Sequence, residues 1–93
     1  MKQIELNNAL VKFASLGMTK EVAKSLELGA DIHSYDDVAL RQAAESGHIE
    51  TVKLLLQNGA DISADDNYAL RGAAYCGHIE IVKLLEKYIN REI

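Results

Sequence analysis

One segment of 30 residues occurs three times along this chain. Residues 68–86 are identical to residues 38–56 at 13 of 19 positions, and a more divergent copy lies at residues 8–26. The spacing does not slip, because equivalent residues are always 30 apart. A fixed period of about 20 to 50 residues is typical of repeat proteins, whose units stack side by side. We therefore expect a single domain over residues 1–93, built from three units at approximately residues 4–33, 34–63 and 64–93.

The middle copy predicts a short first helix in each unit. It is expected to follow Asp37, since Asp and Asn are good N-caps and Asn7 and Asn67 hold the same place in the other copies. The helix should run to about Ser46. Gly47 comes next, and glycine suits the left-handed conformation that often ends helices.

A second helix is expected from about His48 to Asn58, followed by a polar connector at residues 63–67. Its apolar residues recur at helical spacing and are Ile49, Val52, Leu55 and Leu56. Helices this short are not stable alone, so their apolar sides must pack against neighbouring units. The predicted fold class is therefore all-α, a solenoid of three helix–turn–helix units with short loops, in which Ala44 and Ala74 are buried between units.

The segment from Ala43 to Ile62 resembles an ankyrin repeat. It reads Ala-Ala-x-x-Gly-His-Ile-Glu-x-Val-Lys-Leu-Leu-x-x-x-Gly-Ala-Asp-Ile, and residues 77–80 repeat its Gly-His-Ile-Glu portion. The similarity extends over roughly residues 7–90. This resemblance implies a stack of helix pairs with a concave face made from the first helices and the loops between units. It also implies a role in protein–protein recognition.

Two features depart from the usual ankyrin pattern. The period is 30 residues instead of about 33, and the first helix begins Tyr68-Ala69-Leu70-Arg71 in place of Thr-Pro-Leu-His. We expect a tight turn where the family has a projecting hairpin. Short repeats of this kind resemble those of giant DNA viruses, which suggests a viral or host-interacting origin.

Arg41 and Arg71 stand where the family has a histidine that ties the start of the helix to the loop. We expect each arginine to bind loop carbonyl groups or the carboxylates of Asp36 and Asp66. Contact with a partner is the alternative for these two arginines.

Composition argues against several classes of function. The net charge is −4 and the basic residues are scattered, which disfavours direct nucleic-acid binding, because such binding depends on Lys and Arg at phosphates. No apolar run approaches the roughly 18 residues of a membrane span, and the polar residues Glu5, Asn7 and Asn8 lead us to expect no signal peptide. The single Cys76 cannot form an internal disulfide, so a cytoplasmic location is expected. Polar changes such as Glu86 in the last copy predict a complete array with polar outer faces.

The sequence shows no evident catalytic or metal-binding set. His48 and His78 lie one unit apart, which is about 8–10 Å between packed helices, whereas two ligands of one zinc ion must each lie about 2 Å from it. We expect these two histidines to help start the second helices, and His33 to be solvated in a loop. Cys76 has no obvious base beside it. The chain is therefore expected not to be an enzyme, and to use no metal, cofactor or small-molecule substrate.

The best candidates for partner contact are first-helix positions that differ between copies, because the repeated frame does not dictate them. They are Lys12, Gln42 and Gly72; Ser15, Glu45 and Tyr75; and Leu16, Ser46 and Cys76. The loop candidates are Tyr35, Asp36, Asp65 and Asp66. Tyr75, Leu16 and Tyr35 are the best anchors, since aromatic and large apolar groups carry much of the energy of interfaces. The alternative is that a neighbouring unit partly covers Leu16 and Tyr75.

These observations favour a module that binds a partner protein through the concave first-helix and loop surface, as a host-directed inhibitor or adaptor. The alternative is an acidic mimic, whose loops would imitate a phosphate backbone and block a nucleic-acid-binding enzyme. A monomer is expected, with an end-to-end dimer as the alternative.

Overall fold

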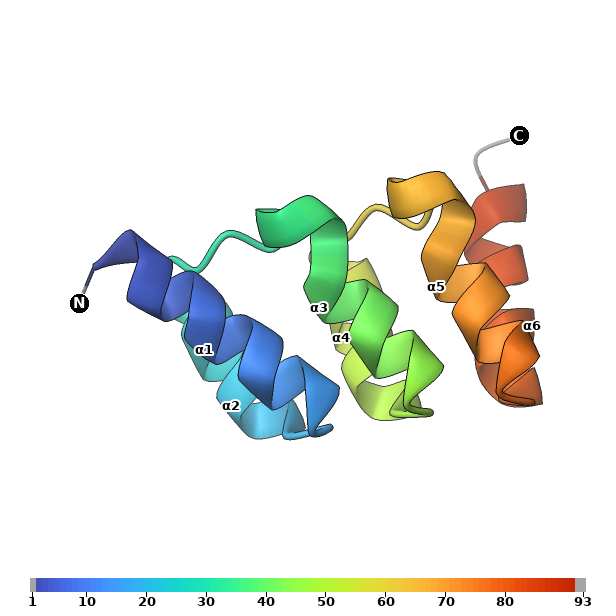
Figure 1. Cartoon of the computed structure of the whole chain (residues 1–93), viewed down its shortest axis with the longest axis horizontal. Helices are drawn as coiled ribbons and strands as arrows, with labels where there is room; N and C mark the ends of the chain where they lie inside the picture. Colours follow the sequence, from blue (N-terminus) through green and yellow to red (C-terminus); the bar gives the residue numbers. More distant parts are fainter. Residues whose placement is uncertain (1, 92–93) are drawn as a thin grey trace.

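The computed structural model describes residues 2–91, which form six helices and no strand. The helices are α1 (Gln3–Ser15), α2 (Thr19–Glu27), α3 (Ser34–Glu45), α4 (Ile49–Gln57), α5 (Ala64–Tyr75) and α6 (Ile79–Asn90). They form three pairs that lie side by side along the long axis of the molecule (Figure 1). The predicted all-α array of three helix–turn–helix units is confirmed, although the third unit, predicted to reach residue 93, runs past the described residues.

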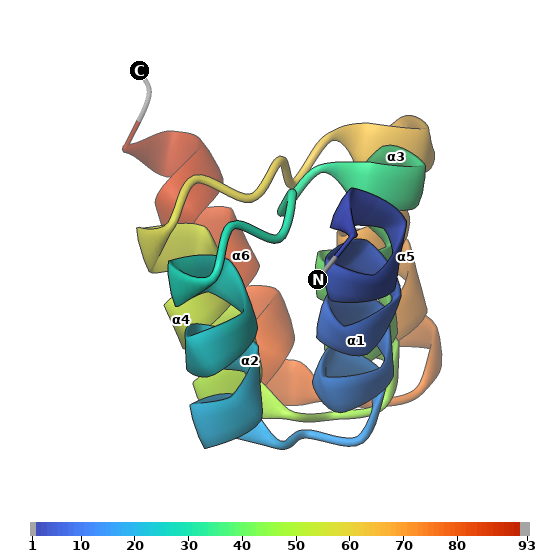
Figure 2. The ribbon, with the colours of Figure 1, turned by 90° about the vertical axis from the view of Figure 1, so that its left-hand side faces the viewer.

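The six helices form two layers. The first helices of the pairs (α1, α3 and α5) contact one another in order, and the second helices (α2, α4 and α6) do the same (Figure 2). The tight turns within the pairs gather at one end of the helices, and the connectors between pairs gather at the other end (Figure 2). The position of a residue is therefore defined by its helix layer and by whether it lies at the tight-turn end or the connector end of the helices.

The core lies between neighbouring pairs. Leu40 of α3 is fully buried, and so are Ala43 and Ala44 on the same helix. Small side chains on this face let the axes of α1, α3 and α5 approach closely. Ala74 was expected to be buried in the same way, but this prediction is wrong, because Ala74 lies on the outer side of the last pair and is exposed.

A histidine ring joins each unit to the one before it. The ring of His48 lies against the turn at Gly17, and its Nε2 atom donates a hydrogen bond to the carbonyl oxygen of Ser15, 3.1 Å away. The ring of His78 lies against Gly47 in the same manner. His48 and His78 occupy the N-cap positions of α4 and α6, as expected of residues that help start these helices, but neither side chain makes a capping hydrogen bond. These side chains instead pack between units.

Replacing Gly47 by alanine should destabilise the protein more than replacing Gly59 by alanine. Both glycines have a positive φ, of 84° and 89°, so each variant bears a cost of about 1 kcal/mol for a side chain in the left-handed region. Only the new Cβ at Gly47 would also lie 2.6 Å from the His78 ring, which adds roughly 1–3 kcal/mol of overpacking. Urea unfolding of the two variants measures the difference.

Gly59→Ala is the matched control, because no described atom beyond its chain neighbours comes within 4 Å of the added Cβ. In a His78→Ala background the Gly47 substitution should lose its extra cost. Equal destabilisation at the two glycines would show that the histidine ring does not constrain the turn.

Candidate functional site

A left-handed turn begins both α3 and α5. Tyr35, Asp36 and Asp37 have φ values of 54°, 58° and 56°. Residues 65–67 repeat the conformation, with φ values of 53°, 57° and 61°. Non-glycine residues rarely adopt this region, and Asp and Asn tolerate it best. The polar connector, where a tight turn was expected in place of a projecting hairpin, therefore leads into a defined left-handed turn.

Arginine side chains hold these turns from within. Arg41 donates from Nε to the carbonyl oxygen of Asp36 and from Nη2 to that of Tyr35, both at 3.0 Å. Arg71 binds the carbonyl oxygens of Asp66 and Asp65 in the same way, at 2.9 and 3.2 Å. The planar guanidinium group fits two parallel acceptors, which a lysine does not. The prediction that these arginines bind loop carbonyls is confirmed.

Replacing Arg71 by lysine should destabilise the protein although it conserves the charge. A single ammonium group cannot reach both carbonyl oxygens, so the loss should be on the order of 1 kcal/mol. Urea unfolding measures the change in the free energy of unfolding. Lys83→Met, which replaces an exposed cation on α6, is the comparison variant. An Arg71→Lys protein as stable as the parent would show that the paired hydrogen bonds of the guanidinium group do not stabilise the turn.

Asp37 does not cap α3 through its side chain, so that prediction is wrong. Its buried carboxylate accepts the backbone N–H of Asp61 at 2.8 Å and the Nδ1–H of His33 at 2.9 Å. In the first unit, the side-chain oxygen of Asn7 likewise accepts the backbone N–H of Asp31 at 2.8 Å. This position therefore ties the start of the first helix to the end of the same unit.

His33 is exposed, as expected for a loop histidine, but its ring is held by Asp37. The hydrogen bond to Asp37 raises the pKa of His33 above its ordinary value of about 6.5, against the opposing effect of partial burial. The negative charges of Asp37, Asp31 and Asp61 raise this pKa further.

The stability that His33 contributes should be greatest in mild acid. Because its pKa is raised by folding, the contribution is fully present below about pH 6.5 and is lost as the pH rises through the folded-state value. The difference in urea midpoint between the parent and His33→Gln should be larger near pH 5.5 than near pH 8.5. The difference should be modest, because 54% of the His33 side chain is exposed and solvent screens the pair. Equal differences at the two pH values would contradict the pairing with Asp37.

The predicted contact residues divide into two groups at opposite ends of the first helices. Tyr35, Asp36, Asp65 and Asp66 lie at the left-handed turns, at the connector end. The other group lies along the first helices towards the tight turns, and we call its exposed or half-buried members the turn-end surface. These are Lys12, Ser15, Leu16, Gln42, Glu45, Ser46, Tyr75 and Cys76.

Three of the candidates expose large side chains. The exposed fraction is 86% for Tyr75, 56% for Leu16 and 54% for Tyr35. The alternative in which a neighbouring unit partly covers these side chains is therefore wrong for Tyr75, whereas the 56% exposure of Leu16 is compatible with partial cover. Tyr35 differs from the other two, because its hydroxyl donates a hydrogen bond to the Asn8 side chain of the preceding unit at 2.8 Å.

Gly72 does not belong with the exposed candidates, because it is buried. A Cβ at this position would lie 3.3 Å from the ring of Tyr68 and 3.4 Å from the Cβ of Glu45. The Tyr68 hydroxyl also donates a hydrogen bond to the Glu45 carboxylate. The difference between Gly72 and its counterparts therefore reflects close packing between α3 and α5.

Sequence analysis missed Tyr68. The guanidinium groups of Arg41 and Arg71 each lie 5.4 Å from the centre of its ring, so the ring joins the arginines of two units. The sequence did contain a signal for this contact. Tyr68 stands where the middle copy has Val38, and the same copy has Gly72 where the middle copy has Gln42.

The acidic loops also carry positive charge. A carboxylate oxygen of Asp65 lies 3.4 Å from Nη1 of Arg41, and Arg71 sits inside the turn that contains Asp65 and Asp66. Within residues 2–91, no three His, Cys, Asp or Glu side chains are placed to hold a metal ion. No helix in this part of the chain is both long and apolar enough to cross a membrane.

Comparison with known families agrees with this geometry. The family model described as ankyrin repeats (3 copies) matches residues 5–93. The chain belongs to the ankyrin-repeat family. Ankyrin repeats generally bind other proteins, so the coarse prediction of a protein-binding module is confirmed. A search of curated proteins finds no match to this ankyrin array, and its resemblance to viral repeats stays a prediction.

Proposed function

We propose that this ankyrin array binds a partner protein through its turn-end surface. The observation that carries the proposal is the exposure of Tyr75, whose side chain projects from the end of α5 with 86% of its area accessible. Aromatic side chains supply much of the energy of protein interfaces when a partner covers them. The proposed role is binding without catalysis, as an inhibitor or adaptor.

The variation between units supports the choice of this surface. Leu16, Ser46 and Cys76 occupy equivalent exposed positions, yet they share no chemistry. The packing between units therefore does not dictate these residues. Because packed units are about 10 Å apart, a partner that touches both Leu16 and Tyr75 would span roughly 20 Å and contact all three units.

The connector end is the weaker candidate. Tyr35 and Asp65 already bond to the preceding unit, through Asn8 and Arg41 respectively. Mimicry of a nucleic-acid backbone by these loops is also disfavoured, because the arginines in the same turns offset their negative charge. We propose that one copy of the chain suffices for binding, since the turn-end surface lies within one chain.

Tyr75→Ala should weaken binding to a partner captured with the parent protein. The dissociation constant should rise about tenfold or more, because a large aromatic side chain that a partner covers behaves as a hot spot. Calorimetric titration of the purified partner measures the change.

The matched control is Tyr35→Asn, which removes an exposed tyrosine at the connector end and suits a positive φ. It should leave the dissociation constant unchanged. Loss of binding by Tyr35→Asn together with unchanged binding by Tyr75→Ala would move the site to the connectors and overturn the proposal.

A further inference from the structure

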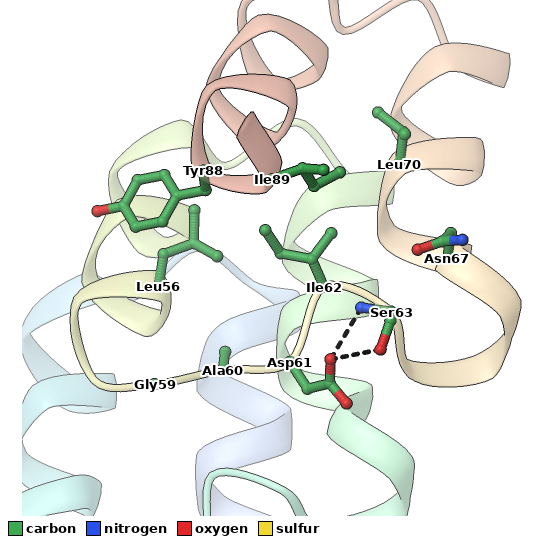
Figure 3. Close-up of a pocket in the computed structure, with 10 residues that line it drawn as sticks. All are labelled: Leu56, Gly59, Ala60, Asp61, Ile62, Ser63, Asn67, Leu70, Tyr88 and Ile89. Atoms are coloured by element: carbon green, nitrogen blue, oxygen red, sulfur yellow. Dashed lines mark hydrogen bonds between the residues drawn. The ribbon is translucent and has the colours of Figure 1, made fainter. Parts of the chain in front are cut away.

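A pocket of about 620 Å³ lies at the connector end of the third unit, between the start of α5, the end of α6 and the connector that follows α4 (Figure 3). Asn67 and Leu70 line it from α5, and Tyr88 and Ile89 line it from α6 (Figure 3). Ile62 of the connector lies between these two walls (Figure 3). The pocket thus combines apolar side chains with the polar side chains of Asp61, Ser63 and Asn67.

The chain itself fills the equivalent place in the first two units. In unit one the side chain of Asn7 accepts the backbone N–H of Asp31, and in unit two Asp37 accepts that of Asp61, both at 2.8 Å. Each of these N–H groups belongs to a non-helical Gly-Ala-Asp-Ile segment. The alanine and isoleucine of each segment are partly buried against the core.

Within the described residues, the third unit places no such segment over its pocket. Ile89 replaces the glycine that ends α2 and α4, so α6 continues to Asn90, and the N–H of Arg91 bonds to Lys87 at 3.2 Å. Within residues 2–91, the side chain of Asn67, the counterpart of Asn7 and Asp37, makes no hydrogen bond. Leu70 is only half-buried, whereas its counterpart Leu40 is fully buried.

We propose that this pocket binds a non-helical segment of a partner protein with the pattern small residue, polar residue, branched apolar residue. This pattern is taken from the segments that occupy the equivalent sites in the first two units, Ala30-Asp31-Ile32 and Ala60-Asp61-Ile62. The Asn67 side-chain oxygen accepts the backbone N–H of the polar residue. The branched side chain packs over Leu70. The pocket lies at the opposite end of α5 from Tyr75, so this site is separate from the turn-end surface.

The probe is a blocked peptide that copies residues 58–63, titrated into the isotope-labelled full chain and followed by NMR. Saturable shifts are expected at the Leu70 and Ile89 methyl groups and at the Asn67 side-chain amide. A peptide methylated on the backbone nitrogen of its aspartate lacks the donor and should bind about five- to tenfold more weakly. Replacing the isoleucine of the peptide by serine should also weaken binding.

Variants of Asn67 test the acceptor. Asn67→Gly keeps the positive φ of 61° without strain and should weaken binding as much as methylation of the peptide does. Asn67→Asp should retain binding, because a carboxylate already serves at Asp37. Gln57→Ala removes an exposed amide that does not line the pocket and should change nothing.

The proposal is overturned if no saturable shift occurs, if the shifts fall on the turn-end surface, or if the methylated peptide or the Asn67→Gly protein binds with unchanged affinity. Tyr75→Ala should leave peptide binding intact, which separates this result from the fate of the proposed function.

Discussion

Each helix pair in this chain buries apolar surface against its neighbours as well as within the pair, so the contact between units governs both stability and shape. Three features make the contact close: the alanines on the facing sides of the first helices, the glycine turns, and the histidine rings that lie on those turns. Thr19 and Thr51, hydrogen-bonded at 2.8 Å, add a polar link between α2 and α4. Because the same contact recurs every 30 residues, even a short chain forms an elongated array with a continuous row of first helices.

The left-handed turns explain how this array works with a period shorter than the family's. Three consecutive non-glycine residues with positive φ are costly, and this cost recurs in two units. Arg41 and Arg71 offset it with hydrogen bonds to the carbonyl oxygens of the two turns. In the second unit the carboxylate of Asp37 also links the turn to the backbone N–H of Asp61. The residues that hold the turns are thereby committed to structure, which leaves the variable positions at the tight-turn end for recognition.

The sequence was sufficient for the architecture because helical spacing and the fixed period are local, repeated signals. It was also sufficient for Arg41 and Arg71, because the resemblance places them where the family has a histidine that binds the loop. It was insufficient where one residue's environment depends on another unit. Asp37 has the side chain of a typical N-cap, but the fold places the backbone N–H of Asp61 beside it. The glycine at position 72 is explained by the nearby ring of Tyr68. Ala74 is exposed because it lies on the outer side of the last pair.

Native-state hydrogen exchange tests the dependence on neighbouring units most directly. Units that are stable only through their neighbours should open from the ends, since the middle pair has two partners and each end pair has one. The amides of α3 and α4 should therefore exchange most slowly, and those of α1, α2, α5 and α6 faster. End pairs that exchange as slowly as the middle pair would contradict this account.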